Sequence, residues 1–406
     1  MAEDQLPSPA NVRRFVPPPL MAVARTVRRW RALGPRLGSY APRTTLELPS
    51  HLPAGCSVPA LDFHTHLGRW LTGTGTWMEP DVGRVLGLMD ECNVAGLVNL
   101  DGRWGRELEA NLDRYDRAYP GRFFTFCHLD WGLLDQPGGP DLLVRSLERS
   151  VAAGARGIKV WKDLSMRVKL YGRTTDRRVL PDDPGLAPLW EAAGALSVPV
   201  VIHVADPVAF FQPVDRHNER LEELLRGGKS PHQPGGLDEF HRLLNAFENL
   251  VASHPRTAFV SAHGCWVENL GRVSAMLDRY PNLHIDLAAV AHQLGRQPRA
   301  ARALFLRHPD RVLFGTDEFP MRAAVHRMYF RILETDDEAF AYSDEPVPPN
   351  GRWLAYGLDL PPSVLEKVYR ANADRLLYLA SPQPGSGEVS RTAPRPPYKP
   401  VPGDGR

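Results

Sequence analysis

Between Pro59 and Ala380, short apolar runs alternate with longer segments in which apolar residues recur every three or four positions. The short runs are rich in Val, Ile and Phe and are bounded by Gly, Pro or Asn, a pattern that predicts buried β-strands. Eight such strands are predicted, at residues 60–66, 95–101, 122–130, 155–161, 199–205, 257–263, 282–288 and 311–317. The helical periodicity between them predicts helices at about 80–92, 105–119, 140–153, 184–197, 237–254, 267–280, 296–308 and 362–378.

Eight strand–helix units in one stretch of chain predict an α/β protein with a (β/α)8 barrel, also called a TIM barrel. An open, doubly wound parallel sheet is the alternative. That fold favours a glycine-rich phosphate turn after an early strand, and neither GxGxxG nor GxxxxGK[ST] occurs in the sequence.

Two connections are longer than ordinary barrel loops. Residues 206–236 follow the fifth strand and residues 318–361 follow the eighth. Long loops at the carboxyl ends of barrel strands commonly cover or line an active site, so both are predicted to be lid loops.

The two ends of the chain differ from its centre. Residues 1–58 carry eight arginines against three acidic residues and include a predicted amphipathic helix between Leu20 and Leu33. Packing of this basic leader on the main domain is favoured over contact with a membrane surface. Residues 381–406 are rich in Pro and Gly and predict a disordered tail. The predicted domains are therefore a leader (1–58), one barrel (59–380) and a tail (381–406).

Composition narrows the class of protein. The 406 residues carry a formal charge of +2, which argues against a nucleic-acid binder that works through bulk charge. Four widely spaced cysteines form no CxxC pair, so neither a disulfide scaffold nor a cysteine zinc site is expected. With no apolar run of transmembrane length and no secretory signal, a cytoplasmic location is expected.

Ionisable residues gather where the predicted strands end. His64 and His66 end the first strand, His203 the fifth, His263 the sixth and Asp317 the eighth. Because the carboxyl ends of barrel strands meet around one mouth, these side chains should converge. Four imidazoles and a carboxylate predict a site for one divalent transition metal, with zinc favoured and manganese or iron as alternatives.

The segments LDFHTH, IHVADP, SAHG and FGTDEFP, with the closing helix VYRANADRLL, resemble the amidohydrolase superfamily. The resemblance is closest to the amidohydrolase-related branch (amidohydrolase family 2) of single-metal barrel enzymes, which includes aminocarboxymuconate-semialdehyde and resorcylate decarboxylases. It implies that His64, His66, His203 and Asp317 bind the metal. It also implies that His263, with Asp317, moves protons or polarises the substrate.

Lys159 lies on the fourth strand, where binuclear members of the superfamily carry a carboxylated lysine that bridges two metals. A possible second-metal bridge at Lys159 is therefore the alternative to a single metal. A plain ion pair at the barrel mouth also explains the lysine, and a single metal is favoured. Strand alternation predicts that only one of Lys159 and Lys162 points inward.

Arg103 and Trp104 follow the second strand and are candidate substrate-binding residues. An arginine at this place suits a substrate carboxylate, and a loop salt bridge is the competing interpretation.

Together these features predict a metal-dependent hydrolase that uses a metal-bound water to cleave a C–N, C–O or activated C–C bond in a small organic molecule. The first alternative is a non-oxidative decarboxylase of an aromatic or muconate-like acid. The second is a barrel that binds without catalysis. The expected partner is a small-molecule substrate, and a homodimer is possible.

Overall fold

The computed structural model describes residues 27, 44–162, 164, 179–226 and 235–379. The predicted leader helix and the predicted C-terminal tail lie outside these residues. By its internal contacts, the chain divides into residues 1–48 and a compact unit that begins at Pro49. The elements described below belong to the second unit.

All eight predicted strands are present, each within three residues of its predicted start and each shorter than predicted. They contain two to six residues and are almost completely buried, because apolar side chains cover both faces. Their bounds are β1 Ala60–Thr65, β2 Val94–Asn99, β3 Phe123–Thr125, β4 Ile158–Val160, β5 Val200–Ile202, β6 Phe259–Ser261, β7 Leu283–Asp286 and β8 Val312–Leu313.

The strands pair in parallel and in chain order, as a barrel requires. Two ladders form, β1-β2-β3 and β4-β5-β6-β7-β8. At one seam, the Lys159 N–H donates to the Cys127 carbonyl over 2.8 Å. At the other, the Phe63 N–H donates to Phe314 O and the Asp317 N–H donates to His64 O, both over 2.8 Å. Single hydrogen bonds, in place of continuous ladders, therefore connect the two sheets of the (β/α)8 barrel.

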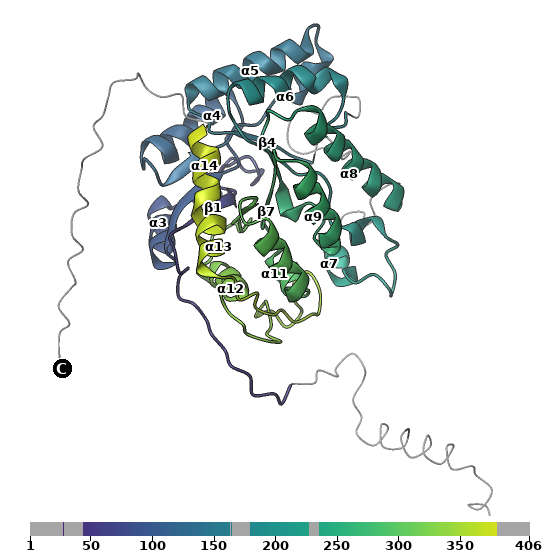
Figure 1. The fold of residues 1–406 in the computed structure, drawn as a ribbon. Coiled ribbons are helices and arrows are strands. Elements are labelled where there is room, and N and C mark those ends of the chain that lie inside the picture. The colour runs from purple at the N-terminus through teal and green to yellow at the C-terminus, as the bar shows by residue number, and fades with distance from the viewer. Residues whose placement is uncertain (1–26, 28–43, 163, 165–178, 227–234, 380–406) are drawn as a thin grey trace, which may run out of the picture. The chain divides into compact units, whose positions relative to one another are not determined.

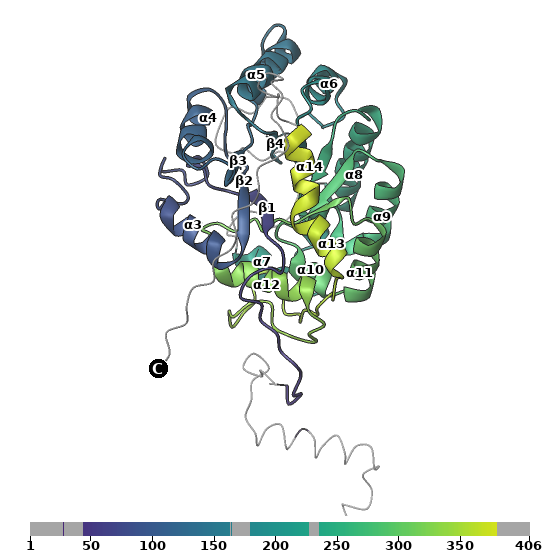
Figure 2. The same ribbon diagram turned by 60° about the vertical axis from the view of Figure 1, so that its left-hand side comes forward.

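Helices surround these strands (Figures 1 and 2). All eight predicted helical segments are helical, although several are divided into two successive pieces. The helices are α3 Val82–Glu91, α4 Gly105–Leu112, α5 Gly139–Ala153, α6 Ala187–Ala195, α7 Leu221–Arg226, α8 Gly236–Ser253, α9 Leu270–Arg279, α10 Ala291–Gly295, α11 Pro298–Arg307, α12 Ala323–Glu334, α13 Pro362–Glu366 and α14 Asn372–Leu379. Short helical turns complete the set: η2 Asp113–Arg117, η3 Trp131–Asp135, η4 Pro184–Leu186, η5 Val208–Phe211, η6 Ala262–Gly264, η7 Val267–Asn269 and η8 Lys367–Ala371.

The two long connections are partly helical. The one after β5 contains η5 and α7, and the one after β8 contains α12. They contact each other directly, since Arg352 pairs with Glu222 through two guanidinium nitrogens and Arg226 donates to the carbonyl of Pro348. Their action as lids stays a prediction.

No helix among the described residues is both long enough and apolar enough to cross a membrane.

Candidate metal centre and substrate cavity

The first strand supplies two histidines whose rings are fixed by buried carboxylates. His64 Nδ1 lies 2.7 Å from Asp286 Oδ2, and His66 Nδ1 lies 2.8 Å from Asp101 Oδ1. All four side chains are buried. A carboxylate at Nδ1 holds a proton on that nitrogen, so Nε2 is the nitrogen of each ring that is free to bind a metal once it carries no proton.

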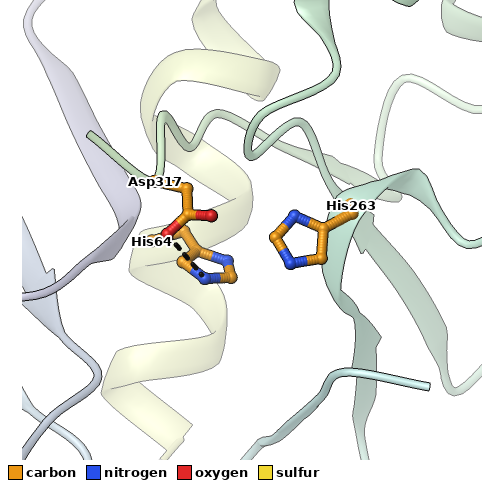
Figure 3. A group of neighbouring side chains, drawn as sticks. All are labelled: His64, His263 and Asp317. Atoms are coloured by element: carbon orange, nitrogen blue, oxygen red, sulfur yellow. Dashed lines mark ion pairs between the residues drawn. The ribbon is translucent and has the colours of Figure 1, made fainter. Parts of the chain in front are cut away.

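Both free nitrogens face Asp317, which follows β8. Asp317 Oδ1 lies 3.1 Å from His66 Nε2 and 3.7 Å from His64 Nε2. Figure 3 shows the Asp317 carboxylate against the His64 ring. The backbone of Asp317 has a φ of +60°, a left-handed conformation that is uncommon outside glycine, and its N–H donates to His64 O.

His263 faces the same group from the end of β6 (Figure 3). Its backbone is also left-handed, with a φ of +59°, and its N–H donates to Asp286 Oδ1 over 2.8 Å. Its Nδ1 lies 2.9 Å from the carbonyl of Ala288, which leaves Nε2 directed at other groups. His64, His263 and Asp317 each place one potential ligand atom within 4.8 Å of the others.

His203 lies beside this trio. Its ring centroid is 4.5 Å from that of His263, and its Nδ1 is 3.1 Å from His263 Nε2. On its other side, Nε2 is 3.6 Å from Asp206 Oδ1. The structure thus brings together all five residues expected at the mouth, and the division of roles among them stays a prediction.

The protonation states suit cation binding. Burial and the neighbouring Lys159 hold the pKa of His64 well below its usual range, so its imidazole is neutral. Burial raises the pKa of Asp317, but His64, His66 and His263 outweigh it and hold the carboxyl well below its usual range. Burial lowers the pKa of His66, yet Asp101 and Asp317 raise it to about 9. The His66 ring therefore carries a second proton beside Asp317, and a bound cation would displace that proton.

Lys159 is the inward lysine of the fourth strand, as the alternation predicts. It is 1% exposed, and its Nζ lies 3.2 Å from His64 Nε2. Burial lowers its pKa to about 8. Lys162 instead pairs with Asp206 over 2.9 Å. The bridging role of Lys159 stays a prediction, although its amine does reach a predicted ligand.

A cavity of about 220 Å³ adjoins the cluster. His203, His263 and Asp317 line it on the side of the strand ends. Much of its remaining wall is apolar and comes from the segments after β5, including α8, and after β6 and β7. These residues are Ala205, Pro207, Val208, Phe210, Phe240, Val267, Ala289 and Val290. An apolar cavity beside a few convergent polar groups is the usual form of a small-molecule site.

Arg103 and Trp104 lie elsewhere. They line a separate, open groove together with Arg69, Trp70 and Glu107, and the Arg103 guanidinium lies 4.2 Å from the Trp104 ring centroid. Neither residue lines the 220 Å³ cavity. Their role in substrate binding stays a prediction, and this placement gives it no support.

Sequence reasoning missed the residues that orient the ligands. Asp62 lies on the same strand as the two histidines but reaches neither ring. It accepts the backbone N–H of His64 and is bonded to Thr316 and His326. The ring of His64 is held by Asp286, from β7. A carboxylate within a strand of apolar neighbours was the available signal, because buried acids are rare unless they are paired.

Comparison with known proteins agrees with this geometry. The family model "Amidohydrolase" matches residues 105–379, from α4 to the end of α14. The chain belongs to the amidohydrolase family. The matched region includes His203, His263 and Asp317, whereas His64 and His66 precede it. No curated protein matches the sequence.

Solved structures share the fold of this amidohydrolase. The 2,6-dihydroxybenzoate decarboxylase from Rhizobium superposes with a TM-score of 0.51 at 18% identity, covering 80% of this chain and 100% of that one. A dihydroxybenzoic acid decarboxylase from a Polaromonas species, solved with manganese and 2-nitroresorcinol, gives a TM-score of 0.51 at 15% identity over 80% and 98% of the two chains.

The residues present fit a divalent metal. Asp317 Oδ1 is buried and, apart from its ion-pair contacts with His64 and His66, has no partner among the described residues, so an oxygen ligand is in place once the proton on His66 leaves. The rings of His64 and His66 are oriented from behind by carboxylates, an arrangement typical of metal-binding histidines.

Proposed function

We propose that this amidohydrolase catalyses non-oxidative decarboxylation of a small, mainly apolar cyclic acid with the help of one divalent metal, zinc or manganese. The observation that carries the proposal is the apolar cavity that opens directly onto His203, His263 and Asp317. Removing a carboxylate from water destabilises its charge relative to neutral CO2, so such walls favour the loss of CO2. That decarboxylases share the fold also supports decarboxylation as the reaction.

His64, His66, Asp317 and, by the resemblance, His203 would hold the metal. When bound, it would supply Lewis acidity toward an oxygen of the substrate. Asp317 and the two histidines of the first strand point their free atoms at one another, which supports this role, and His66 would give up its extra proton when the metal binds. The apolar loops hold the ring of the substrate and exclude water.

We propose that His263 supplies the proton that takes the place of CO2 on the substrate carbon. The carbonyl of Ala288 fixes its Nδ1, so Nε2 is the atom that faces the cavity and His203. The C–C bond would break with its electron pair left on carbon. His263, doubly protonated for this step, would give its Nε2 proton to that carbon and end as the neutral ring with Nδ1–H still donated to the Ala288 carbonyl.

The first test is metal content with carbon dioxide release. Purified protein should contain close to one equivalent of metal, and His64→Ala should lose most of it. Incubation with a panel of carboxylated phenols should release CO2, and His263→Asn should reduce the rate by at least about a hundredfold while keeping the metal. Full activity in metal-free protein would refute the proposal.

Hydrolysis is the second candidate. It is favoured by the family itself and by the position of the Asp317 carboxylate beside His66, one of the predicted histidine ligands. A panel of lactones and cyclic amides tests it with the same protein. Hydrolysis without CO2 release would select this candidate. Metal binding with neither activity across both panels would favour the barrel that binds without catalysis.

A further inference from the structure

The cavity has a second polar region besides the metal cluster. Arg220, Glu223, Glu268 and Asn350 also line it. Arg220 and Glu223 come from the connection after β5, Glu268 from η7 after β6, and Asn350 from the connection after β8. None of these residues was singled out by the sequence analysis.

Arg220 is held firmly although it belongs to a connecting segment. Asn218 donates to the carbonyls of Ala209 and Pro213, and its Oδ1 accepts the Arg220 backbone N–H over 2.9 Å. The Arg220 side chain is only 4% exposed. Its Nη1 donates to Glu223 Oε2 over 2.9 Å, whereas its Nε is buried and has no partner among the described residues.

Glu223 is fully engaged. Its second oxygen, Oε1, accepts from Asn350 Nδ2 over 3.1 Å. Its charge is therefore balanced by Arg220 and both of its oxygens are used. Of the remaining guanidinium donors, the Nε–H of Arg220 is the one that is buried and has no partner among the described residues.

Glu268 offers the complementary atom. Its Oε1 is buried and, among the described residues, accepts no hydrogen bond. Burial raises the pKa of this carboxyl, with Arg220 opposing part of the rise. A buried acceptor and a buried donor without partners are each costly, by about 1–3 kcal/mol. Arg220 and Glu268, which carry these two atoms, both line the cavity, and this favours a ligand group that satisfies both.

We propose that Arg220 Nε and Glu268 Oε1 bind a hydroxyl group of the substrate at a point separate from the metal. A hydroxyl accepts from the arginine and donates to the glutamate with a single oxygen. A carboxylate would satisfy Arg220 but would face Glu268 and Glu223, and an ammonium would satisfy Glu268 but would face Arg220. This inference rests on the proposed function in one respect, that the cavity receives the substrate.

The pair would therefore decide which substrates are accepted. A site built to hydrogen-bond a hydroxyl discriminates strongly against the analogue that lacks it, because the buried polar atoms are then left unpaired. Glu268 is the better residue to change, since Arg220 also has a structural bond to Glu223.

The experiment measures the binding of substituted benzoates to the metal-loaded full chain by calorimetry. The probes are benzoate and its 3- and 4-substituted hydroxy, carboxy and aminomethyl derivatives. We expect one hydroxybenzoate to bind at least about tenfold more tightly than benzoate. In Glu268→Leu this ratio should fall to within about twofold, with benzoate affinity unchanged. Glu268→Gln, which retains an acceptor oxygen, should keep most of the ratio.

Glu366→Leu on the exposed side of α13 is the matched control and should leave the ratio unchanged. Tighter binding of a carboxy or aminomethyl probe than of any hydroxybenzoate overturns the proposal. So does a ratio that survives in Glu268→Leu, or the failure of every probe to bind. Metal content and CO2 release are measured on the same preparations. A Glu268-dependent hydroxyl preference without turnover refutes only the proposed function, and turnover without that preference refutes only the hydroxyl subsite.

Discussion

Replacing Asp286 by asparagine tests whether the buried carboxylates behind the ligands prepare the metal centre. Asp286 Oδ2 lies 2.7 Å from His64 Nδ1, while Oδ1 accepts the backbone N–H groups of His263 and Ala288. Asn has almost the same shape but only one acceptor oxygen. Whichever way the amide turns, its NH2 group faces a donor, either His64 Nδ1–H or the His263 backbone N–H.

The expected cost follows from these contacts. Loss of a carboxylate behind a ligand histidine typically lowers metal affinity 10- to 100-fold. That corresponds to about 1.4–2.7 kcal/mol of binding free energy. The buried donor that loses its partner should also lower the free energy of unfolding of the metal-free protein by about 1–3 kcal/mol.

Competition with a chelating dye measures the metal dissociation constant, and urea unfolding of metal-free protein measures stability. Asp278→Asn is the matched control, because Asp278 pairs with Arg307 on the surface and its side chain is 44% exposed. It should change neither quantity by more than about 0.5 kcal/mol. If Asp286→Asn kept the metal dissociation constant within twofold of the wild type, the orienting role of Asp286 would be refuted.

Three further predictions concern other parts of the unit. Lys159→Met should keep one equivalent of metal, measured by elemental analysis, and loss of one of two equivalents would instead establish the bridged, binuclear form. Burial raises the pKa of Cys127 to about 12 and that of Cys265 to about 11, so alkylation at pH 8 should be slow in the native protein. All four cysteines should react in urea, and rapid native labelling counted by mass spectrometry would contradict the burial argument. Gly102→Ala should lower the unfolding free energy by about 1–3 kcal/mol in urea titrations, because a Cβ there would lie 2.7 Å from Thr125 Cγ2; a change below about 0.5 kcal/mol would contradict this packing.

The barrel could be predicted because each strand–helix unit is encoded by a short local pattern, and that pattern recurs along the chain. The apolar run before His64 and the one before His263 each predict a strand by themselves, and the order of eight such units determines the topology. The convergence of His64, His66, His203, His263 and Asp317 then follows from topology, since the strand ends of a barrel share one face.

The cavity could not be predicted in the same way. Arg220 lies in a long connection without periodicity, and Glu268 lies at the start of a predicted helix, whose periodicity does not reveal the cavity. That both residues line the cavity depends on tertiary contacts such as that of Asn218 with Ala209. Arg103 shows the same limit. Its position after a strand suggested the mouth, and the structure places it with Trp104 in a groove apart from the cavity, on a left-handed backbone with a φ of +58°, so its substrate-binding role stays a prediction. Loop direction is set by turn geometry, which spacing alone does not reveal.

The hydrogen bond from the Asp317 N–H to His64 O has a consequence for the synthesis of the protein. It joins the first strand to the segment that follows the last, and the same two residues are predicted metal ligands. A nascent chain on the ribosome therefore cannot assemble the centre until the eighth strand has emerged, however early the first strands fold. Partial products that lack this strand should have no complete metal site. Incomplete chains should therefore not catalyse the metal-dependent reaction.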